Sequence, residues 1–261
     1  MKTNNTLFGT KMKYSKMIKG LLWGLLLACN PYTQAFAQDL DIEFITESWA
    51  PYNYSENGVI KGFSVEIVQA MMAELEESHK ITLYPGARGE AMLKTKDNIF
   101  SFSLFRTPER ESQYKWIGPI SKEALYFYKR QNDPRIFNSL EDIKKVKKIS
   151  APHKGLVLTA LEDLGLSNIH KMHSLDAQFQ HGIMGRSDLV VNVPTLGLTY
   201  YLKKLNEPSH ALVKTQVKLL EFSLYIACSK KVPDSIIEKW QTALDKVKAS
   251  GQYTKIYNKY L

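Results

Sequence analysis

Arg110 is the residue whose type and setting best suit the binding of an anion. It follows a segment, 99–104, in which apolar residues alternate with serines, and this alternation predicts a β-strand. Thr107 and Pro108 then predict a helix start, because threonine caps helix ends and proline needs no hydrogen bond at the first helical position. The free N–H groups of such a start, with a guanidinium beside them, can bind a carboxylate or a phosphate.

The same stretch also fits a purely structural role. Arg106 and Arg110 stand close to Glu109 and Glu111, and such residues can form ion pairs on the solvated face of a helix. The local pattern leaves both interpretations open, so the rest of the chain has to separate them.

Three aromatic residues stand in a loop that follows the first predicted strand, 40–46. They are Trp49, Tyr52 and Tyr54, and Pro51 between them disfavours regular strand pairing. Ligand pockets are mostly apolar and aromatic, so these rings are candidates for the wall of a small-molecule site. Packing of the loop against the core explains them equally well.

The elements predicted along the chain alternate in type. Such alternation is typical of an α/β fold with a parallel sheet and helices on its faces. Ligands bind beyond the carboxyl ends of the strands in these sheets, where the sequence places Trp49, Arg88 and Arg110. The predicted strands are 40–46, 81–84, 99–104, 124–129, 148–151, 169–172, 188–193 and 221–229, and the predicted helices are 64–77, 88–94, 156–164, 174–184, 196–204, 233–250 and 253–261.

The first 37 residues have the pattern of a secretory signal peptide. Five lysines precede an apolar run at 20–29, and Ala35-Phe36-Ala37 offers a small-x-small cleavage site. This run is too short to span a bilayer, and so is every later apolar stretch. A rival interpretation is a lipoprotein box at 26–29, which would leave Cys29 acylated and the chain anchored to a membrane. We expect a soluble exported protein in the periplasm.

The composition excludes several other kinds of protein. The 261 residues are 44% hydrophobic and 23% charged, which is ordinary for a globular protein. The formal net charge of +9 falls to about +4 without the five lysines of the signal peptide, and no basic helix with interleaved aromatics suggests nucleic acid. Cys228 is then the single cysteine, which excludes an internal disulfide and indicates an inert buried thiol. The six histidines lack metal-ligand spacing, so neither a metal nor a cofactor is expected.

A set of short segments stands in a specific order along residues 40–261. They are Trp49-Ala50-Pro51-Tyr52, Gly62 to Ile67, Arg106 to Glu111, Trp116 to Ile120, Ser139 to Asp142, Gly185 to Asp188, Ser223 to Ala227 and Gly251-Gln252-Tyr253. In order and spacing the chain resembles the bacterial extracellular solute-binding proteins of family 3, the polar-amino-acid type that serves ABC importers.

The resemblance implies the type II periplasmic binding protein fold, in which two Rossmann-like α/β lobes are joined by two hinge strands. Lobe 1 would comprise residues 40–125 plus 221–261, and lobe 2 residues 126–220 including the hinge strands. The ligand would lie between the lobes, which close on it by hinge motion. We expect a monomer whose partner is a membrane permease.

The resemblance also implies site residues. Arg110 matches the arginine that clamps the ligand carboxylate, with backbone help from Ser103 and Phe105. Trp49 matches the aromatic residue that covers the ligand, and Tyr52 lies beside it. Arg88 is a further candidate, although Pro85-Gly86-Ala87-Arg88 lacks the tryptophan that some members carry there.

Lobe 2 departs from the family pattern. Val193 stands where amino-acid binders place the aspartate that holds the ligand ammonium, and Leu156 and Val157 replace the usual threonines. A buried ammonium without a counter-charge is costly. We therefore expect an anionic or zwitterionic small molecule, not a standard α-amino acid held in the usual way. His153 and Asn192 are the predicted lobe 2 contacts, and ordinary structural roles remain open for both.

Two other functions fit the same fold. One is a sensor, in which the clamshell reports its ligand to a separate membrane receptor instead of a permease. The other is an enzyme, since a few proteins of this fold are dehydratases that use carboxylates in the cleft. Glu47, Glu90 and His153 are the candidates for acid–base work, but no pairing or spacing supports them, so we expect a binding protein and not an enzyme.

Overall fold

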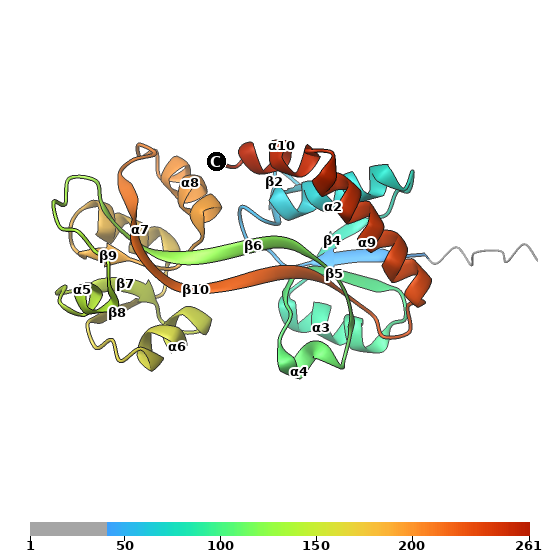
Figure 1. Ribbon diagram of the computed structural model, residues 1–261, viewed down its shortest axis with the longest axis horizontal. Helices are drawn as coiled ribbons and strands as arrows, with labels where there is room; N and C mark the ends of the chain where they lie inside the picture. Colours follow the sequence, from blue (N-terminus) through green and yellow to red (C-terminus); the bar gives the residue numbers. More distant parts are fainter. Residues whose placement is uncertain (1–40) are drawn as a thin grey trace, which may run out of the picture. The chain divides into compact units, whose positions relative to one another are not determined.

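Two long antiparallel strands, β6 (Lys115–Arg130) and β10 (Leu212–Cys228), run through the centre of the fold. They belong to an eight-stranded sheet in the order β4-β1-β5-β10-β6-β9-β7-β8. Figure 1 shows the two strands side by side along their length, with a group of shorter strands and helices at each end. The computed structural model describes residues 41–261, so the predicted signal peptide and Cys29 lie outside the described residues.

The first group of elements continues the sheet beyond β10. It holds β5 (Ile99–Phe105), β1 (Glu43–Thr46) and β4 (Ile81–Leu83), and β1 pairs in parallel with both of the others. A small antiparallel hairpin of β2 (Tyr54–Glu56) and β3 (Val59–Lys61) stands apart from the sheet. The helices of this group are α2 (Phe63–Glu74), α3 (Gly86–Thr95), α4 (Pro108–Glu111), α9 (Asp234–Ala249) and α10 (Gln252–Asn258).

The second group continues the sheet beyond β6. It holds β9 (Leu189–Val190), β7 (Ile149–Pro152) and β8 (Ile169–Met172), in which β7 pairs in parallel with β8 and with β9. Its helices are α5 (Leu140–Lys144), α6 (Leu156–Asp163), α7 (Leu175–Ile183) and α8 (Thr195–Lys204). Each group therefore shows the strand–helix alternation that the sequence predicts, and the α/β prediction is confirmed.

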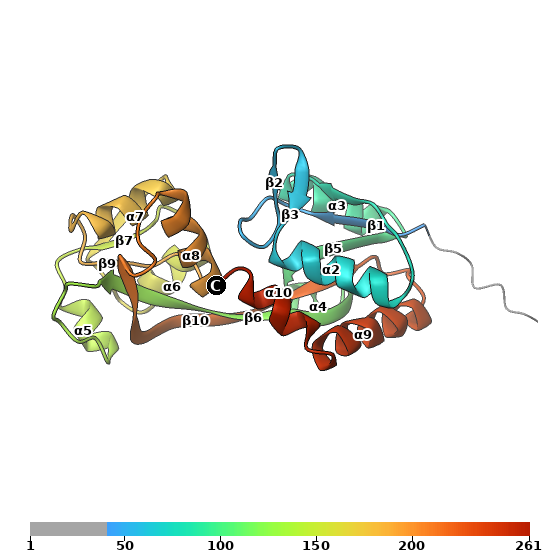
Figure 2. The same cartoon turned by 90° about the horizontal axis from the view of Figure 1, so that it is seen from above.

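Side-chain alternation along β1 and β5 gives the first group a core on each face of its sheet. On one face, Phe44 and Phe100 pack against Trp240 of α9, with ring centroids 4.9 and 6.0 Å from the tryptophan. On the other face, Ile45 packs with Leu93 of α3. Figure 2 shows the resulting layers, with α2 and α9 on one side of these strands and α3 on the other.

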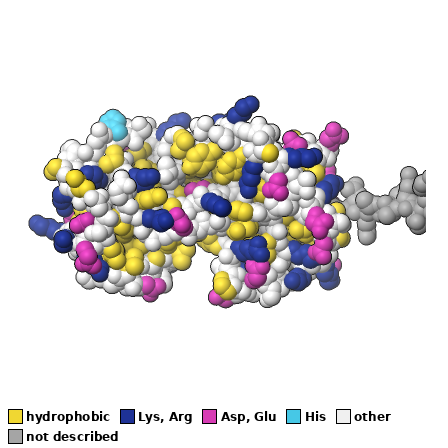
Figure 3. Space-filling model, viewed as in Figure 1, with side chains coloured by type: hydrophobic (Ala, Val, Ile, Leu, Met, Phe, Trp, Pro, Cys, Tyr) yellow, Lys and Arg dark blue, Asp and Glu magenta, His cyan; other side chains and the backbone are white. Residues whose placement is uncertain are grey.

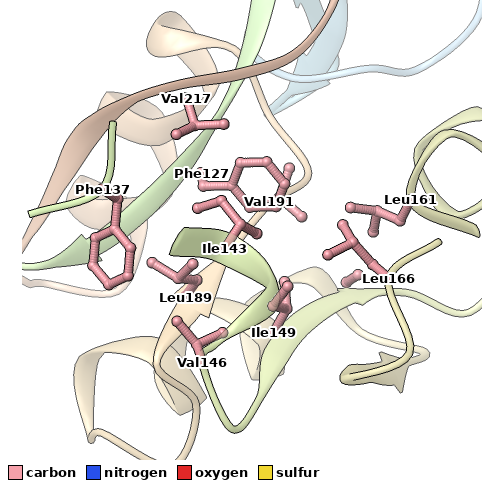
Figure 4. Close-up of a cluster of buried hydrophobic side chains, with 11 residues drawn as sticks. Phe127, Phe137, Ile143, Val146, Ile149, Leu161, Leu166, Leu189, Val191 and Val217 are labelled. Carbon is pink, nitrogen blue, oxygen red and sulfur yellow. The ribbon is translucent and has the colours of Figure 1, made fainter. Parts of the chain in front are cut away.

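The second group has its own hydrophobic core, drawn in Figure 4. Phe127 of β6 and Val217 of β10 extend the two long strands into it, so the same strands contribute to both ends of the fold. The remaining members come from the strands, helices and loops of the second group, and they include Phe137, Ile143, Ile149, Leu161, Leu166, Leu189 and Val191.

Several predicted bounds need correction. β6 begins at Lys115 and not at 124, because Pro119 is accommodated where the pairing of β6 with β10 shifts register. The predicted strand 188–193 ends at Val190, and residues 54–61 form the β2–β3 hairpin, which is missing from the predicted strands. The cap predicted at Thr107 makes no side-chain hydrogen bond, whereas Ser139 and Asp142 form a capping box at the start of α5.

None of the helices between residues 41 and 261 has the length and apolar character that crossing a bilayer requires.

Candidate functional site

A cavity of about 720 Å³ opens at the carboxyl ends of β1 and β5. Most of its lining comes from the first group of elements, and two lining residues, Lys154 and Gly155, come from the second group, directly before α6. Figure 3 shows the surface hollowed below the middle of this face, where α3 and α4 lie opposite α6 in Figure 1. The lining residues used below are Glu47, Trp49, Tyr84, Gly86, Glu90, Ser103, Phe105, Arg110 and Lys154.

Arg110 places its guanidinium in this cavity. Its Nη1 donates to the carbonyl oxygen of Phe105 at 3.4 Å, and its Nη2 lies 3.6 Å from Oε2 of Glu90. The side chain is 31% exposed, so it is half-buried in the lining and does not project freely into solvent. A guanidinium carries five N–H donors, which leaves donors free for an anion after these two contacts.

Arg106, by contrast, has the surface role that the local pattern also allowed. Its Nε donates to Oε2 of Glu111 at 2.7 Å, and its guanidinium lies over the rings of Trp116 and Tyr225. The two arginines of the segment therefore differ: Arg106 forms the exposed ion pair, and Arg110 faces the cavity.

Ser103 interrupts the ladder between β5 and β10. Tyr225 pairs with Leu104 and the next residue, Ile226, pairs with Phe102, so Ser103 has no partner on β10. Its φ of 63° lies in the left-handed region, which a residue with a side chain seldom adopts. The Ser103 hydroxyl is buried and has no hydrogen-bond partner among the described residues. Residues with a strained backbone that are left unpaired in a β-ladder cluster at ligand sites, where the bulge turns polar groups toward a cavity.

Trp49 is held by a tight loop. Its N–H and its carbonyl both bond to Asn53, at 2.6 and 3.0 Å, and its ring packs on Tyr52 with centroids 4.6 Å apart. The carbonyls of Pro51 and Tyr52 accept the first N–H groups of α2, from Phe63 and Ser64. These bonds position Trp49 at the cavity.

Tyr52 lies beneath Trp49 and not in the cavity. It is fully buried, and the pKa of its hydroxyl is raised by that burial and by the nearby carboxyl of Glu123. Tyr52 thus lies beside Trp49 as predicted, but its ring packs under Trp49 and does not line the cavity.

Phe105 belongs to an aromatic cluster with Trp49 and Phe222, of which Phe222 was not a predicted site residue. Its ring lies 6.2 Å from Trp49 and 5.1 Å from Phe222 of β10. Phe222 gave no signal in the sequence because it is one apolar residue among many in a predicted strand.

Three other predicted site residues also lie outside the cavity. Arg88 is exposed and stacks over the ring of Tyr84 at 4.5 Å. His153 packs against the ring of His173, with centroids 4.1 Å apart, although its neighbours Lys154 and Gly155 do line the cavity. Asn192 donates to Oε1 of Gln178 at 2.9 Å, which gives it the structural role left open above.

Two carboxylates of the first group of elements, Glu47 and Glu90, line the cavity. Glu47 lies over the first residue of α3, so closely that a side chain on Gly86 would overlap its carboxylate. Glu90 follows one helical turn later. The pKa of Glu90 is lowered by the hydrogen bond from Lys94 and by the charge of Arg110. Neither was predicted as a ligand contact; both were named only as acid–base candidates.

The fold and the sequence relate this chain to known proteins. A "Probable amino-acid-binding protein YxeM" of Bacillus subtilis is 23% identical over 258 residues, which covers 95% of this chain and 94% of that protein. Substrate-binding domain 2 of Lactococcus lactis GlnP, in an open conformation, superposes with a TM-score of 0.72 at 16% identity, over 85% of this chain and 95% of that domain.

A third comparison gives the same fold. An ancestral cationic amino acid solute-binding protein superposes with a TM-score of 0.71 at 20% identity, over 84% of this chain and 94% of that protein. The predicted type II periplasmic binding protein fold is therefore confirmed. Residues 42–261, nearly the whole described chain, match one family, so that this protein belongs to the bacterial extracellular solute-binding proteins, family 3.

Proposed function

We propose that this protein captures a small carboxylate-bearing or amino-acid-like solute in the cavity beside Arg110. The observation that carries the proposal is the half-buried guanidinium in the cavity lining, whose contacts with Phe105 and Glu90 leave donors free. A planar guanidinium can donate two parallel hydrogen bonds to a carboxylate. Ser103, which has no pairing partner on β10, adds hydrogen-bond donors beside the Arg110 guanidinium. Trp49 offers an apolar face for the rest of the solute.

The proposal includes closure of two lobes, residues 40–125 with 221–261 and residues 126–220. β6 and β10 are the segments that run between the two groups of elements, so bending within them would change the cavity. Lys154 and Gly155 line the cavity from the second group and would move toward Arg110 on closure.

We further propose that the protein works in the periplasm as a monomer after removal of residues 1–37 and delivers its solute to an ABC-type permease. Binding without chemical conversion is favoured because Glu90, a candidate acid or base, is already engaged by Lys94 and Arg110. Recovery of an unchanged solute, followed by mass spectrometry, is the expected result for a binding protein.

The test uses the full-length chain, expressed with its own N-terminal segment and purified after export. A thermal-shift panel of carboxylates, amino acids and polyols identifies the binders, and isothermal titration gives their affinities. Arg110→Ala should remove the ligand-induced shift and weaken binding by about 10- to 100-fold or more, because a charge-assisted pair is lost. Arg106→Ala is the matched control, since that arginine pairs with Glu111 outside the cavity.

Two results would contradict the proposal. One is ligand binding by Arg110→Ala that equals binding by the wild type. The other is a large fall in the melting temperature of the ligand-free Arg110→Ala variant, which would make this arginine a structural residue.

A further inference from the structure

Glu90 occupies an unexpected place beside the proposed carboxylate site. Its Oε2 lies 3.6 Å from Nη2 of Arg110, and both residues line the same cavity. A carboxylate that binds Arg110 must therefore approach a second carboxylate that already contacts this guanidinium. Like charges at such a distance repel, so Glu90 opposes the ligand group that Arg110 attracts.

The position of Glu90 is set by its own helix. Lys94, one turn later on α3, donates to Oε1 of Glu90 at 2.7 Å. That bond leaves Oε2 as the oxygen on the Arg110 side. The lowered pKa of Glu90, caused mainly by Lys94, keeps the carboxyl ionised at neutral pH.

A second acidic residue stands on the same side of the cavity. Glu47 lies over Gly86, and Gly86 and Glu90 are one turn apart on α3. The acidic residues of the cavity lining thus gather at α3, and the second group of elements contributes Lys154 and Gly155. Val193, at the position where a lobe 2 aspartate was expected, is buried in the core of the second group. A cationic group on a bound solute would find its counter-charge at α3.

We propose that Glu90 selects solutes by charge: it disfavours a plain carboxylate at Arg110 and favours a solute that also carries an ammonium or guanidinium group within reach of Glu90. Such a solute satisfies both charges when its carboxylate takes Arg110 and its cationic group takes Glu90. The inference rests on the proposed function, because it requires a solute carboxylate at Arg110. It deepens that function by naming a zwitterionic or cationic class of solute.

The experiment measures how strongly the protein prefers an amino acid over the same molecule without its amino group. Isothermal titration at low salt is run with the twenty L-amino acids, and the tightest binder is compared with its desamino carboxylate, such as propionate for alanine. Glu90→Gln keeps the shape of the side chain and removes its charge. For a half-exposed pair at this distance we expect the preference to fall by roughly tenfold or more, with tighter binding of the desamino acid.

Glu111→Gln is the matched control, because Glu111 pairs with Arg106 and not with Arg110, and it should leave the preference unchanged. Glu90→Ala should narrow the preference in the same way and serves as a second variant. An unchanged preference in both Glu90 variants, with binding still lost in Arg110→Ala, would overturn the role of Glu90 and leave the proposed function standing. Binding of carboxylates but of no amino acid by the wild type would likewise overturn only the role of Glu90. Unchanged binding by Arg110→Ala would overturn both.

Discussion

Gly62 holds the loop that carries Trp49, and replacing it with alanine tests how the site is built. Its φ of 134° lies in a region that residues with a side chain rarely adopt. A Cβ at this position would lie 2.5 Å from the carbonyl carbon of Tyr52 and 2.7 Å from the carbonyl oxygen of Pro51. These are backbone groups, so they cannot turn aside as a flexible side chain would.

The cost of Gly62→Ala follows from the bonds around it. The carbonyls that the new methyl group would meet accept the N–H groups of Phe63 and Ser64, both at 2.9 Å. Backbone strain costs about 1 to 3 kcal/mol. Loss of two hydrogen bonds adds about 0.5 to 1.5 kcal/mol each. We therefore expect the free energy of unfolding to fall by roughly 2 to 6 kcal/mol.

Urea denaturation of the purified chain measures this loss, and Gly58→Ala is the matched control. Gly58 also has a positive φ, 79°, but no atom lies within 4 Å of the position of an added Cβ. Its replacement should cost about 1 kcal/mol from strain alone. In Gly62→Ala, displacement of Trp49 should also weaken solute binding. Equal losses of stability in the two variants would refute the argument that the Pro51–Tyr52 carbonyls hold the loop on α2.

The sequence predicted the order of elements well because strand and helix patterns are local. It missed the length of β6, since Gly118 and Pro119 look like a break when no partner strand is known. The structure accommodates Pro119 at a register shift opposite β10, between Leu224 and Ile226. Such a compensation depends on a strand more than a hundred residues away, and no local pattern reveals it.

The structure brings some of the predicted site residues together at one cavity and turns others away from it, and whether those in the cavity bind a solute stays a prediction. Trp49, Ser103, Phe105 and Arg110 line one cavity. Arg88 was placed at the start of a helix that in fact begins at Gly86. An offset of two residues rotates a helical side chain by about 200°, which is enough to turn it away from a cavity.

The features that define the site most sharply depend on tertiary pairing. The left-handed backbone of Ser103 follows from the skipped pairing between β5 and β10, which the serine alternation in the sequence does not disclose. Glu90 looks like an ordinary solvated residue of an amphipathic helix until Arg110 is placed 3.6 Å away. Charge pairs between distant segments are therefore where the structure adds most to the functional argument.

Two further predictions concern buried carboxyl groups and pH. The hydrogen bonds from Arg135, at 2.6 and 2.9 Å, lower the pKa of Asp133, so Asp133→Asn should cost about 1 to 2 kcal/mol at pH 7. In urea denaturation the stability difference between the wild type and Asp133→Asn should shrink as the pH falls through the lowered pKa. A difference that stays the same from pH 7 down through the acid range would contradict the reasoning. The pKa of Glu123 shifts in the opposite direction. Burial raises it, because the ionised carboxylate loses solvation, and hydrogen bonds with Ser121 and Tyr52 offset part of that rise. A raised carboxyl pKa stabilises the fold below the ordinary glutamate range and loses that contribution as the pH rises through the raised value. The wild type should therefore gain stability relative to Glu123→Gln as the pH falls from 8 to 5, and a difference that does not change with pH would show that Glu123 keeps an ordinary pKa in the folded protein.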